Sequence, residues 1–313
     1  MAYLAGFGHY VPARIVTNAE IGARVDGGPA WDPAWILNVS GIEERRFADA
    51  ESLADLAVKA GELALASAGV LASELEMVIV ASGTSPRSFP GPAISVAERL
   101  GATPAAAIDL PMASAGSLFG LALAARLARR PILVIGAEKM SSVIEREPLE
   151  KGVAILFGDG AGACVVHPQR GFLKVIDSEL CSDGAFAEDL KLEHGQPLAM
   201  NGRVVILQAS RKIPAAITTV LTRNQRTAAE VPVFLMHQAN QNLIDRVAQA
   251  LGVEPTRFYS NIRRYGNTSS ASMLIAASEF FAAQQLLPPG QPVIFAAFGA
   301  GFHWGALLTE TYA

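Results

Sequence analysis

The chain has no excess of charge of one sign. Its 25 Lys and Arg residues nearly balance its 29 Asp and Glu residues, which gives a formal net charge of −4 over 313 residues. Like charges form no long run. A nucleic-acid groove or a polybasic membrane-binding patch is therefore disfavoured, because both depend on clustered Lys and Arg. We expect neither nucleic acid nor a membrane as a partner.

Cysteine and long hydrophobic runs are also scarce. Two cysteines, Cys164 and Cys181, are too few for a disulfide framework, and Cys164 stands in the apolar run ACVV, which is typical of the core. No run of about 18 residues is apolar without polar breaks. Residues 1–16 lack the basic start of a secretory signal. These absences favour a reducing, cytoplasmic location.

What the chain does have is apolar sequence in short blocks. Apolar residues make up 51% of it and charged residues 17%, which is enough for a large core. Continuous Val, Ile, Leu and Ala runs predict strands that are covered on both faces, and helical stretches separate them, so the fold class is α/β. The predicted strands are residues 77–83, 105–110 and 132–138, and the predicted helices are residues 92–101 and 115–130.

The second half of the chain repeats this order. Its predicted strands are residues 233–240, 257–262 and 292–301, and its predicted helices are residues 242–252 and 271–285. Matching strands lie about 155 to 160 residues apart, which indicates two duplicated units. The same offset places the corner at Ser114 on the turn 265–270. Ligands of parallel sheets bind near the carboxyl ends of strands, so two facing corners predict a site. The polar stretch 181–203 is interpreted as a loop or cap over the mouth of that site.

Three polar residues stand at carboxyl ends of predicted strands: Ser114, His237 and Asn267. Ser114 precedes an apolar helix, whose N-terminus favours negative charge and suits a nucleophile. His237 could accept a proton, and Asn267 could donate its amide to an oxyanion. Each residue also has a structural interpretation, as a small packing residue, a satisfied core histidine and a turn residue.

Five motifs give the three residues a common context. The sequences GIEERR (41–46), FGDGAGA (157–163), MHQAN (236–240), YGNTSSAS (265–272) and FGAGFHWG (298–305) stand in this order along the chain. Their order and spacing resemble the β-ketoacyl-ACP synthase III family of the thiolase superfamily across essentially the whole chain. The resemblance implies a thiolase fold, a five-layer αβαβα sandwich of two halves. These would be residues 1–168, with the nucleophile position, and residues 169–313, with the histidine and the asparagine.

The resemblance also implies roles. In that family a cysteine takes an acyl group from a thioester, usually a coenzyme A ester, and a histidine and an asparagine stabilise the enolate of a malonyl thioester. Ser114, His237 and Asn267 match these positions. The oxyanion of the acyl step would be held by the N–H groups of Ser114 and Ala300. The implied partners are acyl-CoA or acyl carrier protein and a second copy of the chain. Neither metal nor cofactor is implied besides the coenzyme A thioester as substrate.

The implied substrate-binding residues lie in several of these segments. Trp35 matches the family's nucleotide-stacking tryptophan, and Phe89 matches a tunnel phenylalanine that reaches into the partner of a homodimer. The remaining residues flank the catalytic positions and are Asn240, Gly299 and Gly301. Asn242 and Leu207 replace basic residues that dock carrier protein in the family. Replacement charge could come from Arg211, Lys212, Arg263 and Arg264, or these could be a solvated face.

Ser114 in place of cysteine is the main departure from the family. A thiol ionises near pH 8.5, whereas a serine hydroxyl is a far weaker acid and needs a base, for which His237 is the candidate. Three interpretations stay open: a native serine nucleophile, an engineered Cys→Ser replacement, or an inert residue. We therefore expect an acyltransferase or condensing enzyme of fatty-acid or polyketide-like metabolism. The alternative is a non-catalytic partner subunit or a decarboxylase.

Overall fold

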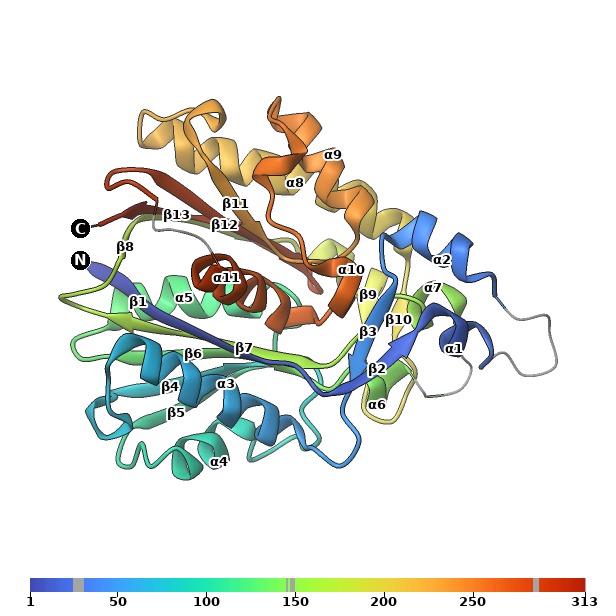
Figure 1. The fold of residues 1–313 in the computed structure, drawn as a ribbon, viewed down its shortest axis with the longest axis horizontal. Coiled ribbons are helices and arrows are strands. Elements are labelled where there is room, and N and C mark those ends of the chain that lie inside the picture. The colour runs from blue at the N-terminus through green and yellow to red at the C-terminus, as the bar shows by residue number, and fades with distance from the viewer. Residues whose placement is uncertain (25–30, 145, 147–149, 284–286, 313) are drawn as a thin grey trace.

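Nine strands form one sheet that folds over on itself in the computed structural model, which describes residues 1–24, 31–144, 146, 150–283 and 287–312. The strand order is β11-β12-β13-β8-β1-β7-β6-β4-β5. The two halves of the sheet join where β1 (Ala2–Tyr10) pairs with the start of β8 (Leu173–Ser182). Figure 1 shows that the two groups of strands diverge from this junction and enclose helices between them.

One group of strands comes from the first part of the chain. Strands β4 (Met77–Ala81), β5 (Ala106–Leu110) and β6 (Ile132–Glu138) run parallel, and β7 (Gly160–His167) and β1 complete the group in antiparallel pairing. The residues of β6 are all buried, as the Val, Ile and Leu run predicted.

The second group comes from the later part of the chain. Strands β11 (Val233–Met236) and β12 (Pro292–Gly299) are parallel. Strand β13 (His303–Thr311) pairs antiparallel with β12 on one side and with β8 on the other. Strands β5 and β11, which precede Ser114 and His237, therefore occupy the two ends of the strand order.

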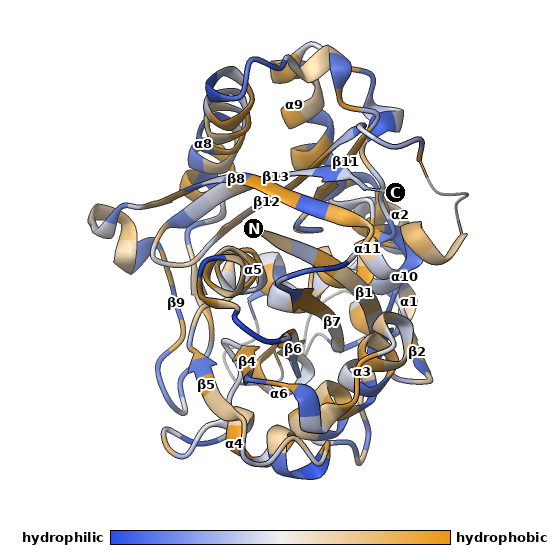
Figure 2. Ribbon diagram, turned by 90° about the vertical axis from the view of Figure 1, so that its left-hand side faces the viewer, coloured by the Kyte–Doolittle hydropathy of each residue, from blue (hydrophilic) through white to orange (hydrophobic). Residues whose placement is uncertain are grey.

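Helices lie on the outer side of each group of strands and also between the two groups, as Figures 1 and 2 show from two sides. The outer layers are α3 (Leu53–Ala68) with α4 (Pro92–Arg99), and α8 (Gly202–Arg223) with α9 (Gln241–Leu251). The middle layer is α5 (Gly116–Leu127) with α11 (Ser272–Ala283). Each of the main apolar clusters lies between a sheet and a helix layer. The predicted α/β class and five-layer arrangement are confirmed.

Shorter elements cover the end of the sheets where the site lies. They are β2 (Arg14–Thr17), α1 (Asn18–Gly22), α2 (Pro33–Ser40), β3 (Glu44–Phe47), α6 (Ser141–Ile144), α7 (Lys151–Ala154), β9 (Leu190–Lys191), β10 (Ala199–Met200) and α10 (Ile262–Tyr265).

Two sequence predictions differ from the structure. Residues 257–262 are not a strand: only Phe258 makes a bridge, to Phe234, and α10 begins at Ile262. The stretch 181–203 is more ordered than a loop, since β8 continues into it, β9 and β10 pair there, and α8 begins at Gly202. Of the predicted helix 271–285, residues 284 and 285 lie outside the described residues.

Within the described ranges, α8 is the one helix long and apolar enough by composition to cross a membrane. Its Ile213, Ile217 and Val220 are fully buried against the apolar cluster that also contains Phe234 and Ile294 of the sheet. That packing identifies α8 as an outer-layer helix of this fold that buries one face against the sheet.

Candidate functional site

Ser114 occupies a tight corner between β5 and α5. Its backbone is left-handed, with φ of 64°, which is a costly conformation for a residue with a Cβ. The corner lies directly against the end of β12, because a Cβ on Gly299 would come within 2.2 Å of the Ala113 carbonyl and 2.7 Å of the Ala115 nitrogen. Gly299 is therefore required for this close approach.

Ser269 holds the same corner from the other half of the molecule. The Ser114 N–H donates to the Ser269 hydroxyl over 3.0 Å, and the two hydroxyl oxygens are 3.5 Å apart. Ser269 is itself left-handed, with φ of 48°. The turn 265–270, which the offset predicted to face Ser114, therefore does contact Ser114, and the residue of the turn that makes this contact is Ser269.

His237 follows β11 and is buried. Its Nδ1 lies 2.6 Å from the Ser272 hydroxyl, which in turn donates to the Ser269 carbonyl over 3.0 Å. Because the single proton of Ser272 is used there, Nδ1–H is the donor to Ser272, and the lone pair of the neutral ring is on Nε2. Burial lowers the pKa of His237 to about 4, and a hydrogen bond to the Ser269 backbone opposes this only in part. The imidazole is therefore neutral near pH 7.

Asn267 is fixed by its neighbours. Its side-chain oxygen accepts a 2.8 Å hydrogen bond from the Ser269 N–H. Its backbone pairs with the segment before β7: Asn267 N–H donates to Leu156 and the Asn267 carbonyl accepts from Gly158. The FGDGAGA motif therefore positions Asn267. With its oxygen occupied, Asn267 presents its NH₂ group as a donor.

The three predicted residues line one cavity of about 230 Å³. Asn240, Gly299 and Ala300 line it with them, and apolar side chains of α8 form a further wall. Asn240 also caps α9, since its oxygen accepts from the Asn242 N–H over 2.8 Å and its NH₂ donates to Val39 over 3.0 Å. The structure thus brings together the residues that the motifs singled out: Ser114 after β5, His237 after β11 and Asn267 after the short helix α10 rather than after a strand.

Trp35, Phe89 and Gly301 are not among the residues that line this cavity. Trp35 lies on α2, with the Lys151 ammonium 3.7 Å from its ring centre. Phe89 is 86% exposed, in the loop between β4 and α4. Gly301, with φ of 131°, lies against the ring of His303, where a side chain would collide.

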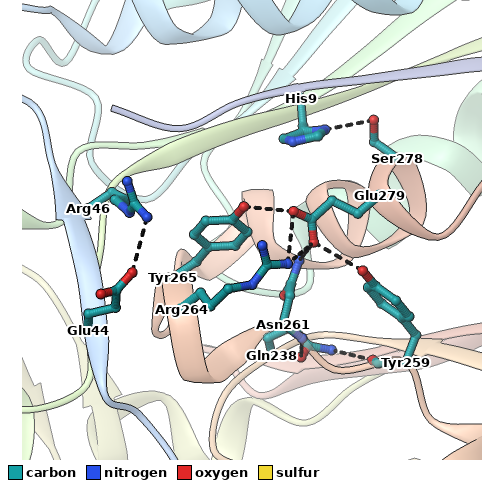
Figure 3. A network of polar contacts seen from close by, with 10 residues as sticks. All are labelled: His9, Glu44, Arg46, Gln238, Tyr259, Asn261, Arg264, Tyr265, Ser278 and Glu279. Carbon is teal, nitrogen blue, oxygen red and sulfur yellow. Dashed lines mark hydrogen bonds and ion pairs between the residues drawn. The ribbon is translucent and has the colours of Figure 1, made fainter. Parts of the chain in front are cut away.

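Gln238, the residue after His237, connects the site to a polar network (Figure 3). Its NH₂ donates to the Tyr259 carbonyl and its oxygen accepts from the Asn261 N–H. The carboxylate of Glu279 on α11 receives hydrogen bonds from Tyr259, Asn261 and Tyr265. These bonds hold residues 257–262, for which the sequence predicts a strand.

Titration of this network is shifted by its surroundings. Burial, together with the nearby carboxylate, raises the pKa of Tyr259 and of Tyr265 to about 12. Burial alone would raise the pKa of Glu279, but hydrogen bonds from Tyr265 and Asn261 and the charge of Arg264 bring it below its ordinary value. Glu279 is therefore negatively charged at neutral pH, and the Arg264 guanidinium, 2.9 Å away, balances this charge.

Three of the four cations considered for carrier docking are paired within the chain. Lys212 pairs with Asp183, Arg263 with Glu43 and Arg264 with Glu279. Cys164 is buried, as predicted, and burial raises the pKa of its thiol. Among the residues that the structure describes, no group of three or more His, Cys, Asp and Glu is placed to hold a metal ion.

Comparisons with known proteins agree with the motifs. Models described as 3-Oxoacyl-[acyl-carrier-protein (ACP)] synthase III and its C terminal match residues 108–184 and 221–311. Beta-ketoacyl-[acyl-carrier-protein] synthase III of Oleidesulfovibrio alaskensis is 36% identical, over 99% of both chains. The protein of that name from Geobacillus kaustophilus is 35% identical, over 98% of this chain and 97% of its own.

Solved structures give the same result. The 3-oxoacyl-[acyl-carrier-protein] synthase III from Aquifex aeolicus superposes with a TM-score of 0.92 at 30% identity, over 99% of this chain and 100% of that one. A priming beta-ketosynthase from a polyketide biosynthetic pathway superposes with a TM-score of 0.90 at 29% identity, over 99% of this chain and 96% of that one.

Proposed function

Because the chain belongs to the 3-oxoacyl-[acyl-carrier-protein] synthase III family, and is thus an acyl-transferring condensing enzyme, we propose that Ser114 is its acyl acceptor. The observation that supports this most is the convergence of Ser114, His237 and Asn267 on one cavity. The donor is the thioester of coenzyme A or of a carrier protein, by analogy with the relatives' printed names and the family resemblance.

In the first half-reaction, the Ser114 oxygen attacks the thioester carbonyl. The Ser114 hydroxyl proton passes to Nε2 of His237, a C–O bond forms and the C–S bond breaks. The proton then leaves with the thiol. A neutral imidazole with its lone pair on Nε2 suits this role, because a protonated ring has no lone pair to accept with.

In the second half-reaction, a malonyl-type thioester loses carbon dioxide. The Asn267 NH₂ stabilises the enolate oxygen, together with a proton that Nε2 of His237 takes up from solvent as the enolate charge develops. The enolate carbon attacks the acyl-Ser114 ester, a C–C bond forms, and the C–O bond to Ser114 breaks. The Nε2 proton of His237 returns to the Ser114 oxygen, which restores the neutral ring, and the β-ketoacyl thioester leaves.

The oxyanion of each acyl step is assigned to the N–H groups of Ala300 and Ser114. Ala300 follows β12 and lines the cavity, which supports its part. The Ser114 N–H already donates to Ser269, so it serves the oxyanion only by sharing or leaving that bond.

The arm of the thioester would extend past Asn240 and Gly299 to Trp35. The Lys151 ammonium over Trp35 offers a cation beside the aromatic ring, a pairing suited to a nucleotide. Gly301 maintains the turn behind Ala300. We assign no metal and no cofactor beyond the thioester substrate, a cytoplasmic location, and two duplicated halves, residues 1–168 and 169–313.

A homodimer completes the proposal. β5 is a sheet edge on which Ile108 is 39% exposed, and Phe89 projects from a nearby loop. An unpaired edge beside an exposed aromatic is typical of a surface that a second copy covers.

The test is condensation with defined substrates. An acyl-CoA and a malonyl thioester should yield a β-ketoacyl thioester and carbon dioxide, both measured by mass spectrometry. His237→Ala and Asn267→Ala should each abolish release of carbon dioxide from the malonyl thioester. Unchanged release in His237→Ala would refute its assigned role.

A further inference from the structure

Glu138 is a fully buried carboxylate to which the mechanism gives no part. It ends β6, and its side chain contacts residues from distant parts of the chain, among them Ser82 and Ser269. All of its contacts are donors: the Gly83 N–H at 3.0 Å and the hydroxyls of Ser82, Thr84, Ser269 and Ser270. A carboxylate only accepts, so the hydroxyls of Ser82, Thr84 and Ser269 direct their hydrogens toward Glu138, whereas Ser270 shares its hydrogen between Glu138 and the Ala81 carbonyl, 2.9 Å away.

This constraint determines how Ser269 faces the site. Ser269 donates to Glu138 Oε1 over 2.9 Å, which uses its only proton. Its lone pairs are then left for Ser114, whose N–H they accept at 3.0 Å and whose hydroxyl oxygen is 3.5 Å away. Without Glu138, the Ser269 proton could turn toward the Ser114 N–H and repel it.

We propose that Glu138 and Ser269 are a positioning pair that orients the Ser114 hydroxyl for acyl transfer. Ser269 holds the Ser114 corner by accepting a hydrogen bond from the Ser114 N–H, and it limits the directions open to the Ser114 O–H. Glu138 acts through Ser269 by keeping it an acceptor. The inference rests on the proposed function, since it assigns the pair to the nucleophile of that reaction.

The chain contains a matched control for this proposal. Ser269 and Ser270 donate to the same oxygen of Glu138, over 2.9 and 2.8 Å, but only Ser269 contacts Ser114. Replacing either one removes one donor from Glu138, and Ser270→Ala also removes the 2.9 Å hydrogen bond from Ser270 to the Ala81 carbonyl. A purely structural role of the carboxylate therefore predicts that Ser270→Ala costs at least as much as Ser269→Ala.

The test is the single-turnover rate of acylation from an acyl-CoA. Ser269→Ala should lower the rate at saturation roughly 100-fold, with little change in the half-saturating concentration, because a misplaced nucleophile binds but does not react. Ser270→Ala should stay within about threefold, as expected for a residue away from the reacting atoms. Equal losses in the two variants would overturn the proposal.

A second measurement does not depend on catalysis. Amide hydrogen exchange at Ser114 should be faster in Ser269→Ala than in Ser270→Ala, because only the first variant loses the acceptor of that N–H. Equal exchange overturns the positioning pair even if the unsubstituted protein forms no acyl adduct. Absence of the adduct, by contrast, overturns the proposed function.

The thiol nucleophile of the family provides a third comparison. In a Ser114→Cys background, Ser269→Ala should cost less than in the serine protein, because a thiolate has no hydroxyl hydrogen to orient. An equal cost in both backgrounds contradicts the assigned role. Glu138→Gln should lower acylation like Ser269→Ala, and the double variant should be no slower, since the two residues act as a unit.

Discussion

The Ser114 amide donates a hydrogen bond to the hydroxyl of Ser269, 155 residues further along the chain, and the backbone of both residues is in the left-handed conformation. The separation lies within the offset of about 155 to 160 residues between matching strands, as two duplicated halves would give. Two strained residues fixed against each other indicate that this conformation serves the site.

Strain at Ser114 predicts that Ser114→Gly stabilises the fold. Removing the Cβ at φ of 64° should raise the free energy of unfolding by about 1 kcal/mol and abolish acylation. Gln225→Gly, at φ of 56°, is the control: it should give a comparable gain with activity unchanged. Denaturant titration measures both. A loss of stability in Ser114→Gly would show that the corner is not strained.

Close approach at Gly299 predicts that Gly299→Ala inactivates the enzyme. The new Cβ would meet the Ala113 carbonyl at 2.2 Å, so the Ser114 corner must shift, at a cost of about 2 kcal/mol. Gly184→Ala, with nothing within 4 Å of its added Cβ, should be neutral. Acylation rate and melting temperature are the readouts, and a fully active Gly299→Ala protein would refute the packing argument.

Burial of neutral His237 predicts an acid-sensitive fold. Its folded pKa of about 4 lies below the ordinary 6.5, so the unfolded chain binds the proton more readily. The cost is absent above pH 6.5, grows as the pH falls, and reaches about 3 kcal/mol near pH 4. His237→Gln should remove this contribution. Unfolding free energies of both proteins between about pH 7 and pH 4 test it, and parallel profiles would contradict it.

Exposure of Phe89 predicts a role in dimer formation. The protein should sediment at twice its 32.9 kDa mass, and Phe89→Ala should weaken the dimer by roughly 30-fold, as truncation of an interface hot spot does. Leu71→Ala is the matched control, because Leu71 is also exposed but lies before β4 rather than after it. A monomer at all concentrations, or equal effects of the two changes, would refute this role.

Much of the fold could be predicted because both-face burial marks a strand directly in the sequence. The runs in β4, β6 and β12 are continuous and apolar, and their boundaries differ from prediction only at the ends. Residues 257–262 were predicted wrongly, since their aromatic and β-branched content favours a strand. Tertiary bonds from Gln238 and Glu279 instead fix this segment as turns and the short helix α10.

The candidate site could be predicted in part for a different reason. Ser114 and His237 follow strands and Asn267 follows α10, but all three stand in sequence motifs, and the order of those motifs along the chain predicted them. Glu138 could not be found this way, because its role depends on contacts across the two halves. Ser272 stands in the YGNTSSAS motif, but only its contact with His237 reveals its role. No local pattern reports that Glu138 meets Ser269, although the 155-residue offset pointed to the right corner.

The most direct test of the account is the intact mass of the protein after incubation with short and medium acyl-CoA esters. We expect an adduct of one acyl group that maps to Ser114 and is absent from Ser114→Ala. Adduct formation in Ser114→Cys alone would mean that the serine replaces a competent cysteine. No adduct in either the unsubstituted protein or Ser114→Cys would contradict the account and indicate a non-catalytic partner subunit.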